Sequence, residues 1–254
     1  MPSENELALA IGEEVDPDRV RTLRESLRGS LAERLHDEAP RIMDRLAVSH
    51  AYDPSAEDAA RRTLRNALLY LMCSHGDATM LDVAERQFRT ADNMTDRLAA
   101  LSALATQDDE RARAALEHFH DSNRDEPLVI DKWLALQAAL PGEGALDRVL
   151  GLQRHGSFTM ENPNRVRSLF GAFAAANPTG FHRADGRGYE WLADRIIELD
   201  RRNRQVAARL ATSLRTYGIY DEKRRERARA ALQRVAETDG LSRDVREIVS
   251  RILR

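Results

Sequence analysis

The stretch FTMENPNRVRSLFGAFAAAN, residues Phe158–Asn177, indicates the fold class of this chain. Asn162 followed by Pro163 predicts a helix start, because Asn caps free amides and Pro suits the first helical turn. Apolar residues then recur at i, i+3, i+4, i+7 and i+8, namely Val166, Leu169, Phe170, Phe173 and Ala174. Asn177 ends the pattern, since the residue before a proline is pushed out of helical geometry. One amphipathic helix with a single buried stripe is therefore predicted.

Two arginines of this stretch, Arg165 and Arg167, lie on the flanks of the stripe, about 90–110° from its centre at 100° per residue. Their spacing fits solvated arginines whose apolar stems cover a core helix. Spacing alone assigns neither of them a ligand.

Similar periodic stretches, bounded by proline, glycine and capping residues, follow one another along the chain. After Asp16-Pro17, the predicted inner face of a long helix holds Val20, Leu23, Leu27, Leu31 and Leu35. The segment 178–188 lacks periodicity and is predicted to be a loop. No strand alternation competes, so the fold class is all-α. We expect a superhelical array of about a dozen short antiparallel helices, HEAT- or armadillo-like, although no strict sequence period is visible.

Composition narrows the function classes. Charged residues make up 32% of the 254 residues and aromatics 5%, which favours helix over sheet. The net charge of −3 gives no general attraction to nucleic acid or to an anionic membrane. The single cysteine, Cys73, fits a reducing compartment, and no apolar run is long enough for a membrane span. These features predict a cytoplasmic protein.

The chemistry of a hydrolase is not visible in this chain. Zinc peptidases need two histidines one helical turn apart with a glutamate between them, and none of the seven histidines has such a partner. Cys73 sits on a leucine-rich stretch and is predicted to be a small core residue. We therefore predict no catalytic residue, no metal ligand and no cofactor site in residues 1–254.

One polar pair stands out. Arg209 lies three residues after Val206 and directly before Leu210, so it is expected to project near an apolar stripe, with Gln205 one turn earlier. An arginine there needs either a carboxylate partner or a wet cavity, because an unpaired buried charge is very costly. The spacing leaves both alternatives open.

Several strings in one order carry a resemblance to a known family: PSENELA (2–8), RTLRNALL (62–69), QFRTADNMTDRLAALSAL (87–104), LVIDKW (128–133), SFTMENPNRVRSLFGAF (157–173), NPTGFH (177–182), GRGY (186–189), RNRQVAARL (202–210) and YDEKRRERARAAL (220–232). These strings run from residue 2 to residue 232, so the resemblance extends over essentially the whole chain. The chain resembles the C-terminal region of the bacterial aminopeptidase N family, zinc metallopeptidases with a thermolysin-like catalytic domain.

The resemblance implies that residues 1–254 are a single C-terminal helical domain of a larger aminopeptidase, whose catalytic zinc domain is absent here. Such a domain would cap the active-site chamber of an enzyme that removes N-terminal residues from peptides. It would be inactive alone, since the zinc ligands and the catalytic glutamate belong upstream. The positions that match Gln205, Arg209 and Arg167 would face the chamber and bind substrate.

The implied partners are the catalytic domain of the same polypeptide and peptide substrates, and one face of the array should be unusually apolar where it covers that domain. The alternative is a free-standing helical-repeat module that binds a protein or peptide in its concave face.

Overall fold

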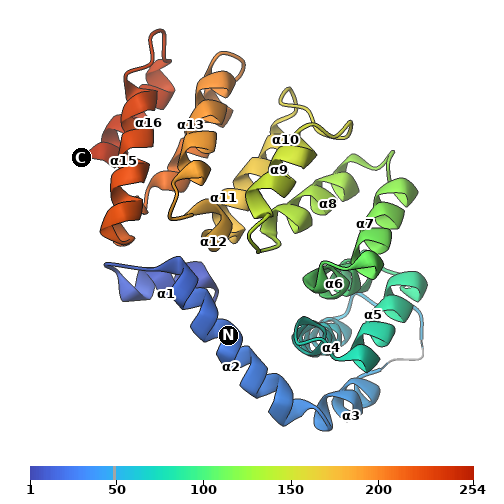
Figure 1. The fold of residues 1–254 in the computed structure, drawn as a ribbon. Coiled ribbons are helices and arrows are strands. Elements are labelled where there is room, and N and C mark those ends of the chain that lie inside the picture. Colours follow the sequence, from blue (N-terminus) through green and yellow to red (C-terminus); the bar gives the residue numbers. More distant parts are fainter. Residues whose placement is uncertain (48–49) are drawn as a thin grey trace. The chain divides into compact units, whose positions relative to one another are not determined.

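The computed structural model describes residues 1–47 and 50–254, and its regular elements are all helical (Figure 1). The all-α prediction is confirmed. The one β-type feature among these residues is an isolated parallel bridge between Val15 and Tyr220. The chain divides into two compact units, residues 24–123 and residues 1–23 with 124–254, and each is described by itself below. The prediction of a single domain stays a prediction.

The unit of residues 24–123 is a stack of helices in which consecutive helices pack on one another. Its elements are α3 (Glu38–Arg45), α4 (Ala56–Ser74), α5 (Ala78–Thr90), α6 (Met94–Leu104), the 3-10 turn η1 (Ala105–Gln107) and α7 (Glu110–Ser122). Helix α6 packs on both α4 and α5, and α7 packs on α6. Asp77 and Asn93 cap the first turns of α5 and α6 with their side chains. This arrangement of paired helices is the one expected for a repeat array.

The unit of residues 1–23 and 124–254 is built in the same way. Its elements are α1 (Glu4–Ile11), α8 (Pro127–Ala139), α9 (Ala145–Gln153), α10 (Pro163–Val166), the π-helical turn η2 (Arg167–Gly171), α11 (Ala172–Ala176), α12 (Pro178–Phe181), α13 (Arg187–Asp200), α14 (Arg204–Ala211), the 3-10 turns η3 (Thr212–Leu214) and η4 (Tyr217–Ile219), α15 (Glu222–Ala236) and α16 (Arg243–Leu253). Helix α2 (Pro17–Leu35) begins in this unit and ends in the other. Helices α13 and α14 pack on each other, and so do α15 and α16. Helix α13 also packs on α15, and α14 packs on α16. These helices therefore form two layers, α13 with α15 and α14 with α16 (Figure 1).

The stretch Phe158–Asn177 lies at the core of this unit. Leu169, Phe170 and Phe173 have no exposed side-chain surface. Trp191 of α13 meets the edges of two of these rings, with centroids 5.1 Å from Phe170 and 5.4 Å from Phe173. Edge-to-face contacts of this kind are favourable beyond the burial of area. The predicted apolar stripe is confirmed.

The backbone of that stretch differs from the single helix that the spacing predicts. It is α-helical in α10 and α11 and π-helical over the five residues of η2 between them. Val166 and Leu169 are both buried; the π turn packs on α8 and α9, and α10 packs on α8. A uniform 3.6-residue period cannot signal such a local widening.

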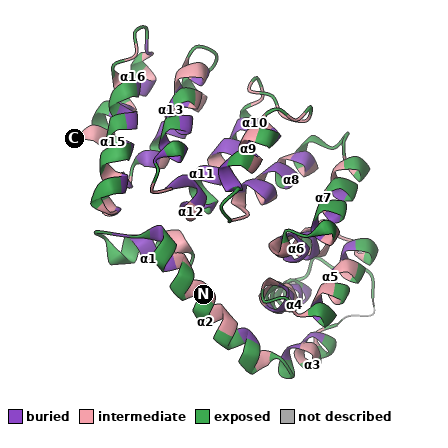
Figure 2. Cartoon of the chain, viewed as in Figure 1, coloured by how far each residue is buried: buried purple, intermediate pink, exposed green. Residues whose placement is uncertain are grey.

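Three other expectations need correction. Val20 is buried as predicted, but Leu23 and Leu27 are 62% and 60% exposed, so most of the predicted inner face of α2 is uncovered within the described residues. Figure 2 shows that helix as mostly exposed and intermediate. Segment 178–188 is not a plain loop, because α12 occupies its first residues. Helix α1 was not predicted, although Ser3 and Glu6 form a capping box that the sequence displays.

No helix among the described residues is both long enough and apolar enough to cross a membrane.

Candidate functional site

Arg167 opens the π-helical turn. Its guanidinium is exposed, and Nη2 donates a hydrogen bond of 2.8 Å to Oδ1 of Asn164 one turn earlier. Single π turns inside helices are rare and are frequent at functional sites. The turn therefore singles out Arg167 by a signal that apolar spacing does not contain.

Arg165, two residues earlier, has a different environment. Its side chain is 11% exposed, and Nη1 donates to Oδ1 of Asp131 and, at 2.7 Å, to the backbone carbonyl of Pro127. Both partners belong to α8, more than 30 residues away in sequence. The interpretation of Arg165 as a solvated residue is wrong, because α8 covers that flank of the helix.

Gln205 and Arg209 lie on α14, whose first turn is capped by the side chain of Asn203 (Oδ1 to the Val206 amide, 3.2 Å). Both side chains are exposed, and their spacing of four residues places them on the same face. The buried face of α14 is formed by Ala207, Leu210 and Ala211. Arg209 therefore points away from the core and not beside an apolar stripe.

The sequence left two environments open for Arg209, a carboxylate partner or contact with water. Among the described residues Arg209 has no carboxylate within ion-pair distance, and its side chain is exposed. A buried ion pair is therefore excluded within these residues. What remains of the two sequence-based alternatives is a guanidinium in contact with solvent.

The structure brings the elements of the candidate site together. Helix α14 packs against the π turn that begins at Arg167, so the three residues come from neighbouring elements of one unit. Among the described residues no hydrogen bond joins Arg167, Gln205 and Arg209 to one another. Two exposed guanidiniums, neither of which has an ion-pair partner in the part of the chain that the structure describes, and one amide supply hydrogen-bond donors that suit an anionic group.

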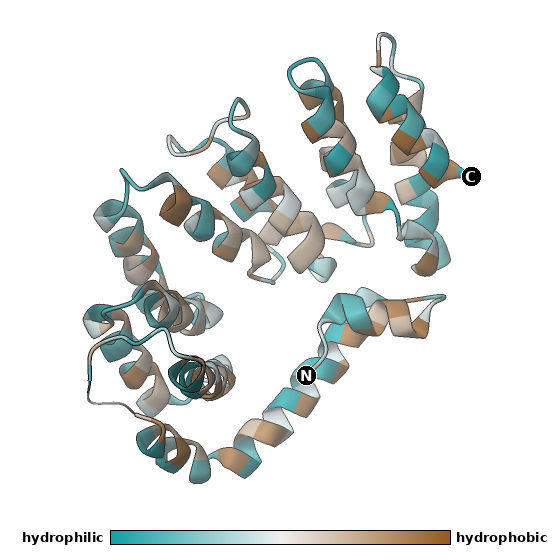
Figure 3. Ribbon diagram, turned by 180° about the vertical axis from the view of Figure 1, so that it is seen from behind, coloured by the Kyte–Doolittle hydropathy of each residue, from teal (hydrophilic) through white to brown (hydrophobic). Residues whose placement is uncertain are grey.

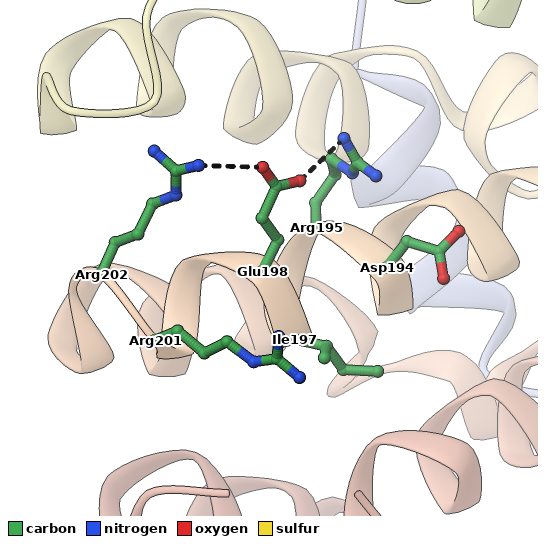
Figure 4. Close-up of a pocket in the computed structure, with 6 residues that line it drawn as sticks. All are labelled: Asp194, Arg195, Ile197, Glu198, Arg201 and Arg202. Atoms are coloured by element: carbon green, nitrogen blue, oxygen red, sulfur yellow. Dashed lines mark hydrogen bonds and ion pairs between the residues drawn. The ribbon is translucent and has the colours of Figure 1, made fainter.

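A second polar feature is an open groove along α13, which sequence reasoning did not predict. Figure 4 shows Glu198 between two arginines, with Arg195 at 3.1 Å and Arg202 at 3.5 Å. The volume of this groove is about 510 Å³. Arg202 also pairs with Glu161 and Asp194 with Arg234, so most charges here are already neutralised. Exposed ion pairs of this kind contribute little, and this groove offers no reactive group.

A buried polar cluster joins the start of α15 to the segment before α13. The ring of His182 stacks on Tyr220, with centroids 3.9 Å apart, and shares a hydrogen bond of 3.0 Å with the Tyr189 hydroxyl. Nε of Arg224 donates to the His182 carbonyl at 2.6 Å, and its other nitrogens pair with Asp221 and Asp18.

Burial, reinforced by the Arg224 charge, lowers the pKa of His182 to about 3. Burial raises the pKa of Tyr220 to about 12 and that of Tyr189 further still. The three side chains are therefore neutral at ordinary pH, and they contact one another by the hydrogen bond and the ring stacking described above. The cluster is a structural hub and not a catalytic centre.

The prediction that Cys73 is a core residue is confirmed. It is fully buried on α4, and burial, followed by the charge of Asp77, raises the pKa of its thiol to about 12. A thiolate is therefore inaccessible at neutral pH.

A bound metal ion needs several side-chain ligands that converge on one point. Across residues 1–47 and 50–254, no group of three or more His, Cys, Asp and Glu side chains is arranged to hold a metal ion. A zinc site of the peptidase kind therefore does not fit these residues.

The chain is similar to known proteins over its whole length. A family model described as a domain of unknown function built of ARM repeats (DUF3458_C) matches residues 1–254. The chain is 42% identical over 254 residues to aminopeptidase N of Escherichia coli (strain K12), and 37% identical over 253 residues to that of Caulobacter vibrioides. All of this chain is covered in both cases, but it spans only 29% of the length of these relatives.

A solved structure shows the same fold. Legionella pneumophila aminopeptidase A, determined in complex with aspartic acid, superposes with a TM-score of 0.91 at 28% identity. The alignment covers 100% of this chain and 30% of that one. The armadillo-like architecture expected from the sequence is confirmed.

Proposed function

The chain belongs to the DUF3458_C family of ARM-repeat domains, and on that premise we propose that it is the non-catalytic helical domain of a zinc-dependent aminopeptidase N. In this proposal it caps the active-site chamber of an enzyme that removes N-terminal residues from peptides. The observation that carries the proposal is the match over the entire chain to aminopeptidase N relatives, of which it spans 29%. The remaining length would supply the catalytic machinery.

The zinc of such an enzyme would bind outside this chain. The described residues do not fit a zinc site, since no metal-ligating group converges among them. The task left to this chain is to shape the chamber and to contact the substrate.

The exposed face of α2 supports a partner within the same polypeptide. Leu23, Leu27 and Leu31 are 62%, 60% and 37% exposed and are spaced four residues apart, so they form one apolar stripe. Figure 3 shows hydrophobic segments recurring along this helix, which passes the N label. Apolar rows of this kind mark surfaces that another protein segment covers. We expect slower amide exchange along α2 in the longer polypeptide than in residues 1–254 alone.

The substrate-contacting role falls to Arg167, Gln205 and Arg209. The guanidiniums of Arg167 and Arg209 have no carboxylate partner among the described residues, and a planar guanidinium binds a carboxylate through two parallel hydrogen bonds. A free peptide ends in such a carboxylate. In this proposal the two arginines bind the C-terminal part of the peptide and Gln205 adds an amide donor.

The decisive experiment replaces Arg209 by alanine in the complete enzyme. We expect peptides with a free C-terminal carboxylate to lose about 1–3 kcal/mol of transition-state or ground-state binding, the value of a charge-assisted hydrogen bond. Single-residue chromogenic substrates lack that carboxylate and should change much less. The melting temperature should stay nearly constant, because Arg209 is exposed.

Arg204→Ala is the matched control, since Arg204 lies on the same helix but pairs with Asp244 on the surface. Equal losses for peptides and chromogenic substrates would reject the role of Arg209. A protein in which residues 1–254 make up the whole product, without a peptidase, would instead support the free-standing repeat module.

A further inference from the structure

A charged cleft between α4 and α5 has no part in the function proposed above. It lies entirely within the unit of residues 24–123 and has a volume of about 470 Å³, inside the range of roughly 300–1,000 Å³ typical of small-molecule sites. Arginines and aspartates both line it. The balance of their pairing indicates what could bind.

Three arginines of the cleft lack a carboxylate partner among the described residues. Arg62 is 8% exposed, and its guanidinium lies over the Tyr52 ring at 4.7 Å. Arg65 has a buried Nε for which the described residues offer no hydrogen-bond partner, and Arg86 enters from α5. Hydrogen bonds and, to a smaller extent, the nearby charge of Arg62 lower the pKa of the Asp92 carboxyl, but no ion pair within the described residues uses the donors of these three arginines.

One buried acceptor in the same cleft is also unsatisfied. The Asp58 side chain is 6% exposed, and its Oδ2 accepts no hydrogen bond from the described residues, although Nε2 of His50 lies 3.3 Å away. Arg61 reaches only the other oxygen, at 3.7 Å, and is mainly paired with Glu57. A buried carboxylate oxygen without a donor destabilises the fold unless a ligand or water supplies one.

Two of the three other aspartates of the cleft have hydrogen-bond donors, and the third, Asp44, is exposed. Asp92 accepts from the Tyr52 amide at 2.9 Å, and Asp96 accepts from Asn66 at 2.8 Å and from Asn93 at 3.0 Å. Among the described residues, the groups of the cleft without a partner are thus arginine donors, the exposed Asp44 carboxylate and the buried Oδ2 of Asp58.

Both kinds lie along one face of α4. Asp58, Arg62 and Arg65 follow at i, i+4 and i+7, so about 10 Å of helix rise separates the first from the last. Long side chains on a helix lean toward its N-terminus, which directs the arginines toward the turn of Asp58.

A simple anion would satisfy the arginines but face the Asp58 carboxylate, and a simple cation would face the reverse conflict. A molecule with an ammonium and a carboxylate satisfies both. We propose that the α4–α5 cleft binds a free α-amino acid, with the ammonium on Asp58 and the carboxylate on Arg62, Arg65 and Arg86.

The test is calorimetric titration of the intact protein at fixed ionic strength with L-alanine, propionate and ethylamine. These probes carry both charges, the carboxylate alone and the ammonium alone. We expect saturable binding of L-alanine, and binding of the other two that is at least about tenfold weaker. Propionate or ethylamine binding as tightly as L-alanine would overturn the proposal in favour of a simple ion site. No saturable L-alanine binding would overturn it in favour of a cleft filled by water.

Variants locate the site. Asp58→Asn and Arg65→Gln should each weaken L-alanine binding by about tenfold or more. Arg86→Gln should also weaken L-alanine binding. This substitution should leave the stability of the fold nearly unchanged, because Arg86 is exposed. Arg89→Gln is the matched control on α5, since Arg89 pairs with Glu85 and does not line the cleft. If Arg86→Gln binds L-alanine as tightly as the parent protein, the site lies elsewhere and the proposal is wrong.

Discussion

Arg165 and Arg167 show how far two like residues can differ when they stand two positions apart. Arg165 is enclosed by α8 and shares an ion pair with Asp131, whose side chain is 13% exposed. Arg167 is exposed and bonds only locally to Asn164 among the described residues. Residue type and spacing are nearly the same, so burial alone separates a structural role from a possible binding role.

This contrast gives a matched test of stability. Arg165→Ala should cost about 3–5 kcal/mol of unfolding free energy, because it leaves the Asp131 carboxylate buried and unpaired. Arg167→Ala should cost less than about 0.5 kcal/mol, as is usual for an exposed position. Urea unfolding of both variants measures the difference. Similar losses for the two would contradict the assigned environments.

His182 gives the protein a pH dependence of stability. Its pKa is lowered to about 3 by burial and then by Arg224, whereas an unfolded histidine titrates near 6.5. The unfolded chain therefore binds more protons between these values, and stability falls as the pH drops from about 6.5 toward 3. The slope from this group is at most about 1.4 kcal/mol per pH unit.

The measurement compares the parent protein with His182→Phe, which keeps a ring against Tyr220 but cannot titrate. The unfolding free energy of the parent protein minus that of His182→Phe should decrease as the pH falls below 6.5, because only the parent protein loses stability through His182. A difference that stays constant from pH 7 to pH 4 would show that His182 does not titrate on unfolding.

At the scale of the element, glycines decide how closely helices approach. A Cβ at Gly188, in the first turn of α13, would lie 2.0 Å from the backbone oxygen of Phe181 in α12. The backbone cannot yield as a flexible side chain can. At Gly151, an exposed position of α9, an added Cβ would point into open space among the described residues.

Alanine at these two glycines should therefore act in opposite directions. Gly188→Ala should lose at least about 2 kcal/mol of stability through overpacking. Gly151→Ala should gain about 0.5–1 kcal/mol, because alanine suits a helix interior better than glycine. Thermal melts of the two variants check the signs, and a stable Gly188→Ala protein would disprove the close approach of α12 and α13.

For the molecule as a whole, the function proposed above implies that residues 1–254 are inactive alone. Expressed alone, they should bind no stoichiometric zinc and hydrolyse no aminoacyl substrate, because in that proposal the zinc ligands and the catalytic base lie in the rest of the polypeptide. Elemental analysis and a chromogenic peptidase assay test this. Tightly held zinc at one ion per chain, together with activity, would reject the division of labour proposed above.

Much of the fold could be predicted from local signals. The starts of α5, α6, α14 and α16 follow from capping side chains next to apolar periodicity. The stripe from Val166 to Ala174 is buried as its spacing indicates. Of the candidate site, the sequence supplied Arg167, Gln205 and Arg209 only through family resemblance, and their substrate role stays a prediction.

Local sequence patterns are enough to predict that this chain is helical and where most helices begin, because helix periodicity and capping depend on residues within one or two turns of each other. Which apolar faces are covered depends on how the helices pack: Leu23 and Leu27 follow the same spacing as core residues and yet are exposed. Tertiary packing likewise decided that Arg165 is paired, that Arg209 points away from the core, and that unsatisfied charges meet between α4 and α5. The physical reason is that burial and ion pairing depend on elements tens of residues apart, whose approach no local pattern specifies.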